Sequence, residues 1–332
     1  MPCNSCSKMM NFFAPFISLC IFFAFNISVS HAFDTGISGM ARVRDNTFLV
    51  VNDRKNSHKK DQDLANTKPR LGIVTVKKKW VAYEDLYVKY PLSMSDMPPN
   101  DLEAVCALPH REHEYLVAES GYYEGRYGRV FHLRLKEKKG KWKGELISAI
   151  RPFSKNTSTD TTPKSRQIEG MSCVEKAEAQ LLVIFATRGG GGKRGKLIWG
   201  SLDGLDQSQP AFHPLGDAQI VTDQQSLGDR DASDLFLEKT KKDQWKVWTI
   251  AVDDPGDDFG PFRSVIYSPG IFEWDNEQGL TFHRTKPVTG WVRDGVKVEA
   301  LAEPAERVKG SVFSIGTEDE ALGGMWQPLF QP

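Results

Sequence analysis

Ile168-Glu169-Gly170-Met171 is one of five copies of a short pattern: an apolar residue, an acid or Ser, a small residue, and then an apolar run. The other copies are Ile37-Ser38-Gly39-Met40, Leu102-Glu103-Ala104-Val105, Ser233-Asp234-Leu235-Phe236 and Val298-Glu299-Ala300-Leu301. The second member stands at positions 38, 103, 169, 234 and 299, so successive copies lie 65 or 66 residues apart. So regular a step indicates an internal structural repeat.

Each copy opens a series of apolar runs that turn residues separate. The second run of each copy covers Thr47 to Asp53, Glu114 to Glu119, Leu181 to Arg188, Lys246 to Asp254 and Ser311 to Glu318. The third covers Arg70 to Val76, Gly128 to Leu135, Gly195 to Gly200, Arg263 to Tyr267 and Gly324 to Phe330. A fourth is visible in most copies, for example Trp80 to Tyr87, Glu145 to Ile150 and Leu280 to Arg284. These runs are rich in Val, Ile, Phe and Tyr, which is typical of strands.

Five repeats of four antiparallel strands predict an all-β fold with little helix, a five-bladed β-propeller with four-stranded blades. A single four-stranded sheet would expose both apolar faces, whereas blades packed around an axis cover each other. Six blades are an alternative if two short ones have been merged, and a pair of β-sandwiches does not explain the constant step. Only Phe33 to Gly36 precede the first copy. We therefore expect an N-terminal strand to close the ring only in part.

The first 32 residues have the composition of a cleaved signal peptide. They hold one base, Lys8, and no acid, then an apolar run from Phe12 to Phe25, and they end in Ser30-His31-Ala32. A membrane anchor is the alternative, but the run is short for a span, which needs about 20 apolar residues. We expect cleavage after Ala32. The mature chain would be a single propeller domain over residues 33–332 with no membrane span, and we expect it to be secreted or periplasmic.

The overall charge excludes a strong bias toward polyanions. Lys+Arg and Asp+Glu balance at 43 each, so we expect no nucleic-acid partner. We expect a monomer. Cys106 and Cys173 are the cysteines beyond the signal segment. They lie in corresponding strands of neighbouring repeats, where they either face each other or point apart.

The repeat gathers acidic residues at one mouth of the propeller channel. The first strand of each blade lines the axis, and the second returns to the same mouth. We therefore expect an inner ring and a second ring there, which we predict to bind a metal through Glu103, Glu169, Asp234, Glu299, Asp53, Glu119, Asp253 and Glu318. Converging carboxylates repel, and hard cations such as Ca²⁺ prefer oxygen ligands. The alternative is structural: the acids cap turns or pair with bases, with Arg188 and Arg230 as candidates.

A glycine-rich basic loop leaves the same mouth. It covers Arg188 to Lys196 and reads RGGGGKRGK, so Arg188, Lys193 and Arg194 are candidate substrate-binding residues. It is not a nucleotide P-loop, because Leu197 stands where Ser or Thr must hold Mg²⁺ and no helix follows. The alternative is a solvated hairpin loop.

The openings of the repeats resemble a known family. Ile37-Ser38-Gly39-Met40-Ala41, Asp101-Leu102-Glu103-Ala104-Val105, Ile168-Glu169-Gly170-Met171 and Val298-Glu299-Ala300-Leu301-Ala302 are similar to those of secreted phytase-like (esterase-like phytase) β-propellers. The ending Gly316-Thr317-Glu318-Asp319-Glu320, followed by Gly323-Gly324, resembles that family's last blade. The resemblance implies an exported propeller with esterase or phosphoesterase activity and Ca²⁺ dependence. Ala104, Ala300, Ser38 and Arg188 depart from the family pattern.

Two functions are compatible with these features. We expect an exported, non-catalytic propeller that binds a small molecule or an envelope partner, with rim aromatics such as Tyr122-Tyr123 and a Ca²⁺-binding axial site. No His belongs to either acidic ring, which favours this reading over catalysis. The alternative is a metal-dependent esterase or phosphoesterase, in which Ca²⁺ polarises the ester and Arg188, Lys193 and Arg194 offset its charge.

Overall fold

The computed structural model describes residues 32–53, 70–91, 99–123, 126–153, 162–163, 166–176, 180–207, 210–222, 230–256, 259–319 and 323–332. The expected signal peptide lies outside these residues, apart from Ala32. Within the described residues, no helix is long and apolar enough to cross a membrane.

The strands form five antiparallel sheets, each arranged as a meander. The first contains β2 (Gly39–Arg44), β3 (Thr47–Val51), β4 (Leu71–Val76) and β5 (Val81–Asp85). The second contains β7 (Leu102–Ala107), β8 (Glu114–Glu119), β11 (Val130–Lys138) and β12 (Lys141–Ile150). The third contains β13 (Ile168–Lys176), β14 (Gln180–Thr187), β15 (Lys196–Asp203) and β16 (Ala211–Gln219). The fourth contains β17 (Leu235–Lys241), β18 (Gln244–Asp253), β19 (Arg263–Asp275) and β20 (Gly279–Asp294). The fifth contains β21 (Val298–Ala302), β22 (Ser311–Thr317), β23 (Gly324–Phe330) and β1 (Ala32–Phe33).

Two short pieces lie outside this plan. β6 (Val88–Lys89) runs parallel to β12 at the outer edge of the second sheet. β9 (Tyr122–Tyr123) pairs with β10 (Arg126–Tyr127) in a small hairpin after β8.

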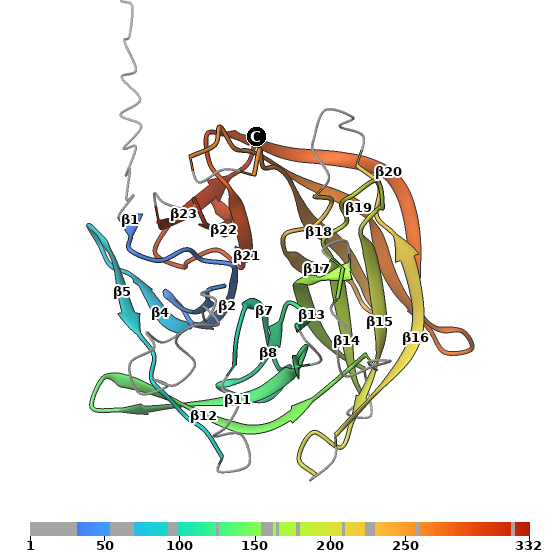
Figure 1. The fold of residues 1–332 in the computed structure, drawn as a ribbon, viewed down its shortest axis with the longest axis horizontal. Coiled ribbons are helices and arrows are strands. Elements are labelled where there is room, and N and C mark those ends of the chain that lie inside the picture. Colours follow the sequence, from blue (N-terminus) through green and yellow to red (C-terminus); the bar gives the residue numbers. More distant parts are fainter. Residues whose placement is uncertain are drawn as a thin grey trace, which may run out of the picture.

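The five sheets stand around a common axis as the blades of a propeller (Figure 1). The innermost strands contact one another in a closed cycle, β2 to β7, β7 to β13, β13 to β17, β17 to β21 and β21 to β2. The prediction of a five-bladed, four-stranded, all-β propeller is confirmed, and the six-bladed and sandwich alternatives are excluded.

Five hydrophobic clusters hold the ring together, one at each interface between neighbouring blades. Blades 1 and 2, for example, share a cluster that includes Leu49, Ile73, Val117 and Phe131. The other four clusters join blades 2 and 3, 3 and 4, 4 and 5, and 5 and 1. Each sheet is therefore apolar on both faces, which explains why its strands read as continuous apolar runs rather than as strict alternation.

The N-terminal strand closes the ring. β1 supplies the fourth strand of blade 5, where Ala32 pairs with Met325 and Phe33 with Gly324. Phe33 is buried, and its ring lies 5.3 Å from that of Tyr83 in blade 1. Closure is partial, as expected, because β1 spans only two residues of the seven-residue strand β23.

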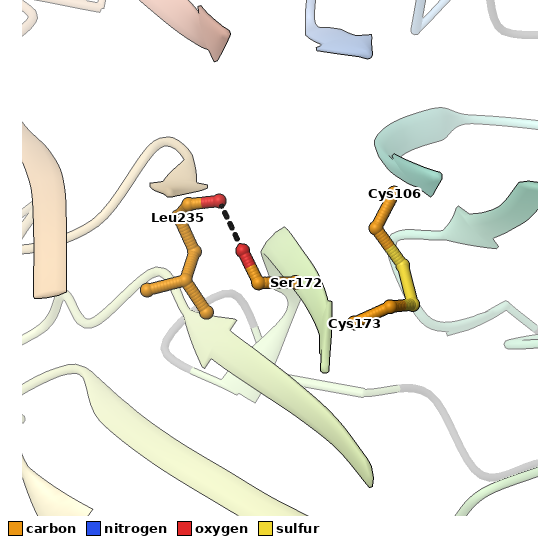
Figure 2. Close-up of a disulfide and its surroundings, with 4 residues drawn as sticks. All are labelled: Cys106, Ser172, Cys173 and Leu235. Atoms are coloured by element: carbon orange, nitrogen blue, oxygen red, sulfur yellow. Dashed lines mark hydrogen bonds between the residues drawn. A yellow bond between two sulfur atoms is a disulfide. The ribbon is translucent and has the colours of Figure 1, made fainter. Parts of the chain in front are cut away.

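Cys106 and Cys173 form a disulfide between β7 and β13, the innermost strands of blades 2 and 3 (Figure 2). Their Cα atoms are 5.8 Å apart. On the other side of β13, Ser172 donates a hydrogen bond of 2.8 Å to the carbonyl of Leu235 in β17. Of the two arrangements left open by the sequence, the cysteines adopt the facing one. The disulfide joins blades 2 and 3, and the Ser172 hydrogen bond joins blades 3 and 4.

The strand boundaries in the structure differ most from those predicted by the sequence in blade 4. The sequence places the third strand at Arg263 to Tyr267, but β19 continues to Asp275. Pro269 and Gly270 lie within this strand, where the pairing register shifts between Ser268 and Gly270. A side chain at Gly270 would collide with the carbonyl of His283. The dipeptide is therefore a bulge within a long strand, a position that tolerates Pro.

Candidate functional site

Three of the predicted inner-ring acids occupy β-bulges at the start of the innermost strands. In blade 2, Leu102 pairs with Glu119 and Ala104 with Ala118, so Glu103 has no residue opposite. The same break in register falls at Glu169 and at Glu299. A bulge turns its extra residue out of the regular alternation of side chains. The backbone of each blade thus sets the direction of the acidic side chain, and it does so at the equivalent strand position in blades 2, 3 and 5.

These three acids lie close enough to influence one another at the mouth of the channel. All three are buried, with 8% or less of each residue exposed. Burial raises the pKa of Glu103 well above its ordinary value, and Glu169 and Asp101 raise it further. Glu103, Glu169 and Glu299, from blades 2, 3 and 5, therefore meet at one mouth of the channel, as the repeat predicts.

One side of the mouth is acidic. Asp53, Asp101 and Glu103 come from blades 1 and 2, and each offers a carboxylate oxygen within 4.8 Å of the others. Asp101 and Glu103 are buried and Asp53 is half-buried. The charged groups that dominate the pKa of Glu103 after burial are all acids, namely Glu169, Asp101, Asp53 and Glu299. An oxygen-binding cation or bound protons would relieve this repulsion. We call these three residues the acidic triad.

The other side of the mouth contains bases. Arg230 donates a hydrogen bond to Glu299. Lys297 Nζ lies 3.3 Å from Glu299 Oε1 and 3.6 Å from Glu318 Oε2. Arg188 Nη1 lies 3.7 Å from Glu169 Oε1. Charge is therefore divided across the mouth, with the bases gathered around Glu169 and Glu299.

The bases set the protonation of the acids beside them. Burial opposes ionisation of Glu299, but Lys297 and Arg230 outweigh it and lower the pKa to about 2. Burial and the neighbouring Glu299 raise the pKa of Glu318 well above its ordinary value. Glu318 forms side-chain hydrogen bonds with both Glu299 and Asp53, and both contacts raise its pKa further. Glu299 is thus held by Lys297 and Arg230, whereas Glu318 connects this side of the mouth to Asp53.

Two other predicted ligands have structural partners. The Asp234 carboxylate accepts hydrogen bonds from the backbone N–H of Leu235 at 2.7 Å and of Leu301 at 2.6 Å. Asp234 thus ties β17 to the innermost strand of the next blade. Glu119 accepts from the Arg129 side chain at 2.6 and 3.0 Å. Asp234 and Glu119 therefore fit the alternative in which the acids have structural roles and cap backbone groups or pair with bases.

Register explains why Glu119 does not belong with the second ring. It pairs with Leu102, and the corresponding pairs in blades 3 and 5 are Ile168 with Thr187 and Val298 with Thr317. Glu119 is therefore equivalent to these threonines, one residue before the positions of Arg188 and Glu318.

The remaining ring positions have different surroundings. Asp253 pairs with Arg263 at the end of β18. The Ser38 hydroxyl accepts a hydrogen bond of 3.1 Å from the Asp53 backbone N–H. Ser38 therefore positions the acidic triad from blade 1.

The glycine-rich loop is a tight hairpin. Gly190 and Lys193 exchange both backbone hydrogen bonds, and Gly191 and Gly192 between them have positive φ angles of 60° and 74°. Glycine meets that requirement without strain. Lys193 is exposed, and Arg194 lies 3.1 Å from Asp231. Of the three predicted substrate-binding residues, Arg188 is the one that reaches the acids of the mouth.

A second cluster with metal-ligand chemistry lies at the opposite face, where Glu114, His132 and Asp206 approach within 4.8 Å. Bases already occupy it. Arg134 Nε donates to Glu114 at 2.8 Å, and Arg111 donates two hydrogen bonds of 2.7 Å to Asp206. The two carboxylates are neutralised by two guanidinium groups, so this cluster is an ion-pair network between blades 2 and 3.

Sequence reasoning missed Asp101 and Lys297, and it considered Arg230 only as a pairing partner. A signal for the first two is visible in retrospect. The residue two positions before the bulge acid is Asp101 in blade 2, Gln167 in blade 3 and Lys297 in blade 5. This position varies in charge, and it determines whether the neighbouring Glu is left with acids or paired with a base.

Comparisons with known proteins identify no family for this chain. No family model matches the chain, and no curated protein matches it. The β-propeller domain of Nup133 from Vanderwaltozyma polyspora has 15% identity and a TM-score of 0.37, over 87% of this chain and 80% of that domain. The Pan2 WD40 domain of Neurospora crassa has 12% identity and a TM-score of 0.34, over 89% of each chain. The N-terminal domain of Nup159 has 11% identity and a TM-score of 0.34, and this chain covers 65% of its length. The five-bladed fold is given by the sheets described above, and the function has to be argued from the chain's own residues.

Proposed function

We propose that the protein is an exported binding propeller that holds a hard divalent cation, with Ca²⁺ as the first candidate, in the acidic triad Asp53, Asp101 and Glu103. The observation that carries this proposal is the approach of three carboxylates within 4.8 Å in largely buried surroundings, with acids as the dominant charged neighbours of Glu103. Ca²⁺ takes about 6–8 oxygen ligands, and three carboxylates supply up to six. Water or a ligand would complete the coordination.

The division of charge indicates what the mouth would bind beside the cation. Arg230 and Lys297 are engaged with Glu299, whereas the Arg188 side chain is 23% exposed at the rim. A ligand with an anionic group could contact the cation and Arg188 together. In this proposal the ligand is held without being converted.

The test is calcium titration calorimetry on the protein that begins at Phe33. We expect binding by the unsubstituted protein and at least about tenfold weaker binding by Glu103→Gln and by Asp101→Asn. Glu114→Gln is the matched control, because it removes a carboxylate from the opposite face, and it should bind calcium normally. An unsubstituted protein that binds neither Ca²⁺ nor Mg²⁺ would exclude the cation site.

Metal-dependent esterase or phosphoesterase activity is the second candidate. It is favoured by Arg188, which lies at the rim of the same mouth and could offset the charge of a phosphoester. A panel of chromogenic esters and phosphoesters, with calcium and with chelator, separates the two functions. Calcium-dependent turnover that Glu103→Gln abolishes would establish an enzyme.

We also propose export with cleavage after Ala32. The cut would leave Phe33 as the first residue, and Phe33 is buried in the ring-closing strand. The mature protein would thus retain the residue that anchors its N-terminus. Intact mass and N-terminal sequencing of the exported product test the site, and a product that retains Met1 would contradict it.

A further inference from the structure

Two outer turns of neighbouring blades carry nearly the same basic sequence. The turn between β4 and β5 reads Lys77-Lys78-Lys79-Trp80, and the hairpin of β11 and β12 contains Lys138-Lys139-Gly140-Lys141-Trp142-Lys143. All seven lysines are exposed. We call these seven lysines, with Trp80, the basic ridge.

The basic ridge lies on the face opposite the acidic triad. Strands β4 and β11 both begin at the end of the blade where the triad lies and run away from it, so their following turns are at the far face. The pairing of β11 with β8 ends at Arg134 and Glu114, but β11 continues to Lys138. The second turn therefore projects beyond its own blade.

Side-chain contacts hold the two turns near each other. Arg44, at the end of β2, lies 2.7 Å from Glu137 in the projecting hairpin, and its guanidinium stands 5.2 Å from the centre of the Trp142 ring. The Val76 backbone N–H, directly before the first turn, donates to the carbonyl of Asn46, two residues after Arg44. The turn between β2 and β3 is thus the common support of both parts of the ridge.

The charge of the ridge is not compensated locally. Among the described residues, none of the seven lysines forms an ion pair, whereas neighbouring charges are matched: Arg44 with Glu137, and Lys136 with Glu145 at 2.7 Å. The chain as a whole carries no net charge. Seven unpaired positive charges on two adjacent turns are therefore a local excess with no counterpart in the overall composition.

We propose that the basic ridge docks the protein on an anionic phospholipid surface. Lysines on convex turns act as separate point charges, which suits a laterally mobile anionic surface better than bidentate recognition of one ligand. Trp80 is 49% exposed beside three of them, and Trp side chains favour the membrane interface. Docking through this face would leave the acidic triad pointing away from the bilayer and open to solvent.

The test is vesicle co-sedimentation with the protein that begins at Phe33. We expect binding to vesicles of equal parts phosphatidylglycerol and phosphatidylcholine, no binding to phosphatidylcholine alone, and release by high salt. Each lysine near such a surface strengthens binding roughly fivefold. The triple variant Lys138→Glu, Lys139→Glu, Lys141→Glu should therefore bind at least about tenfold more weakly.

The control carries the same charge change elsewhere. Arg151→Glu, Arg166→Glu, Lys196→Glu alters three bases at the mouth end of blades 2 and 3, on the face opposite the ridge, and it should reduce binding much less. If the two triple variants lost vesicle binding equally, binding would depend on net charge alone, and the proposal that the basic ridge is the docking surface would be overturned. Failure of the unsubstituted protein to bind the anionic vesicles would overturn the membrane proposal, as would capture by dextran sulfate without vesicle binding. Calcium titration of the ridge variant keeps this test independent of the cation site.

Discussion

At the scale of single residues, the neighbours of each acid in a β-bulge determine the direction in which its pKa is shifted. Glu103 and Glu299 occupy the same backbone feature and are both buried, yet their pKa values move in opposite directions. The difference lies two residues upstream, where blade 2 has Asp101 and blade 5 has Lys297. The same backbone geometry thus gives a protonatable acid on one side and a permanent anion on the other.

Arg230 should be essential to this balance. Glu299 and Glu169 hold its pKa above the ordinary value although burial opposes its charge. Removing one partner of a buried ion pair leaves a buried charge without compensation and costs about 3–5 kcal/mol. Arg230→Gln should therefore lower the free energy of unfolding by about 3 kcal/mol in urea titrations. Arg44→Gln, which breaks an exposed pair, is the control and should cost less than about 1 kcal/mol. Equal stability of Arg230→Gln and the unsubstituted protein would show that the acids at the mouth need no base.

His132 should make stability depend on pH. Its side chain is fully buried, Nε2 lies 2.8 Å from Glu114, and Nδ1 is buried without a hydrogen bond from the described residues. Burial lowers its pKa below 6.5 and outweighs Glu114. Because the unfolded chain then binds the proton more readily, the contribution to stability is complete above pH 6.5 and is lost as pH falls toward the folded pKa.

The check is melting temperature against pH for the unsubstituted protein and for His132→Gln. The variant should lose the part of the slope just below pH 6.5. It should keep the decline at lower pH, because Glu114 with its lowered pKa is still present. Parallel curves for the two proteins would mean that His132 stays uncharged over this range or does not affect stability.

At the scale of elements, the sequence predicts strand order well and local register poorly. The bounds of β8 and β23 agree with the predicted runs, because turn residues mark both ends of each. The bulge at Glu103 leaves no such mark, since it changes the pairing and not the apolar pattern. Without the bulge, Glu119 counts as a ring residue; with it, Glu119 is equivalent to a threonine and binds Arg129.

The disulfide should be the main covalent support of the inner ring. It joins β7 to β13 across a sequence separation of 67 residues. Loop-closure entropy for a loop of this length corresponds to about 4 kcal/mol. The double variant Cys106→Ala, Cys173→Ala should thus be about 3–4 kcal/mol less stable, and reductant should lower the unsubstituted protein toward the same value. A reductant effect on the double variant itself would assign the change to another cause.

At the scale of the whole molecule, the 65-residue step of the repeat predicts the ring of blades but not how charge is distributed over its two faces. The step predicts that residues far apart in the chain meet at one axis, and Glu103, Glu169 and Glu299 do so. It does not predict that Arg230, which lies outside the repeated pattern, reaches Glu299. It also does not show that two lysine-rich turns share a face, because that depends on how far β11 extends past β8.

Closure of the ring should govern how the propeller opens. Strand β1 joins the N-terminal end of the chain to the C-terminal blade. Of its two residue pairs, Phe33 with Gly324 would remain after the proposed cut, and Phe33 packs in the cluster between blades 5 and 1. Phe33→Ala would leave a cavity there and cost about 3 kcal/mol. Since the loss falls at the seam between the two ends of the chain, amide hydrogen exchange should speed up first in β21 to β23 and β2 to β5. The third blade, β13 to β16, lies away from the seam and is the internal reference, which should exchange at its original rate until global unfolding. Acceleration spread evenly over all five blades would mean that the ring opens as one unit and that β1 is no special point of weakness.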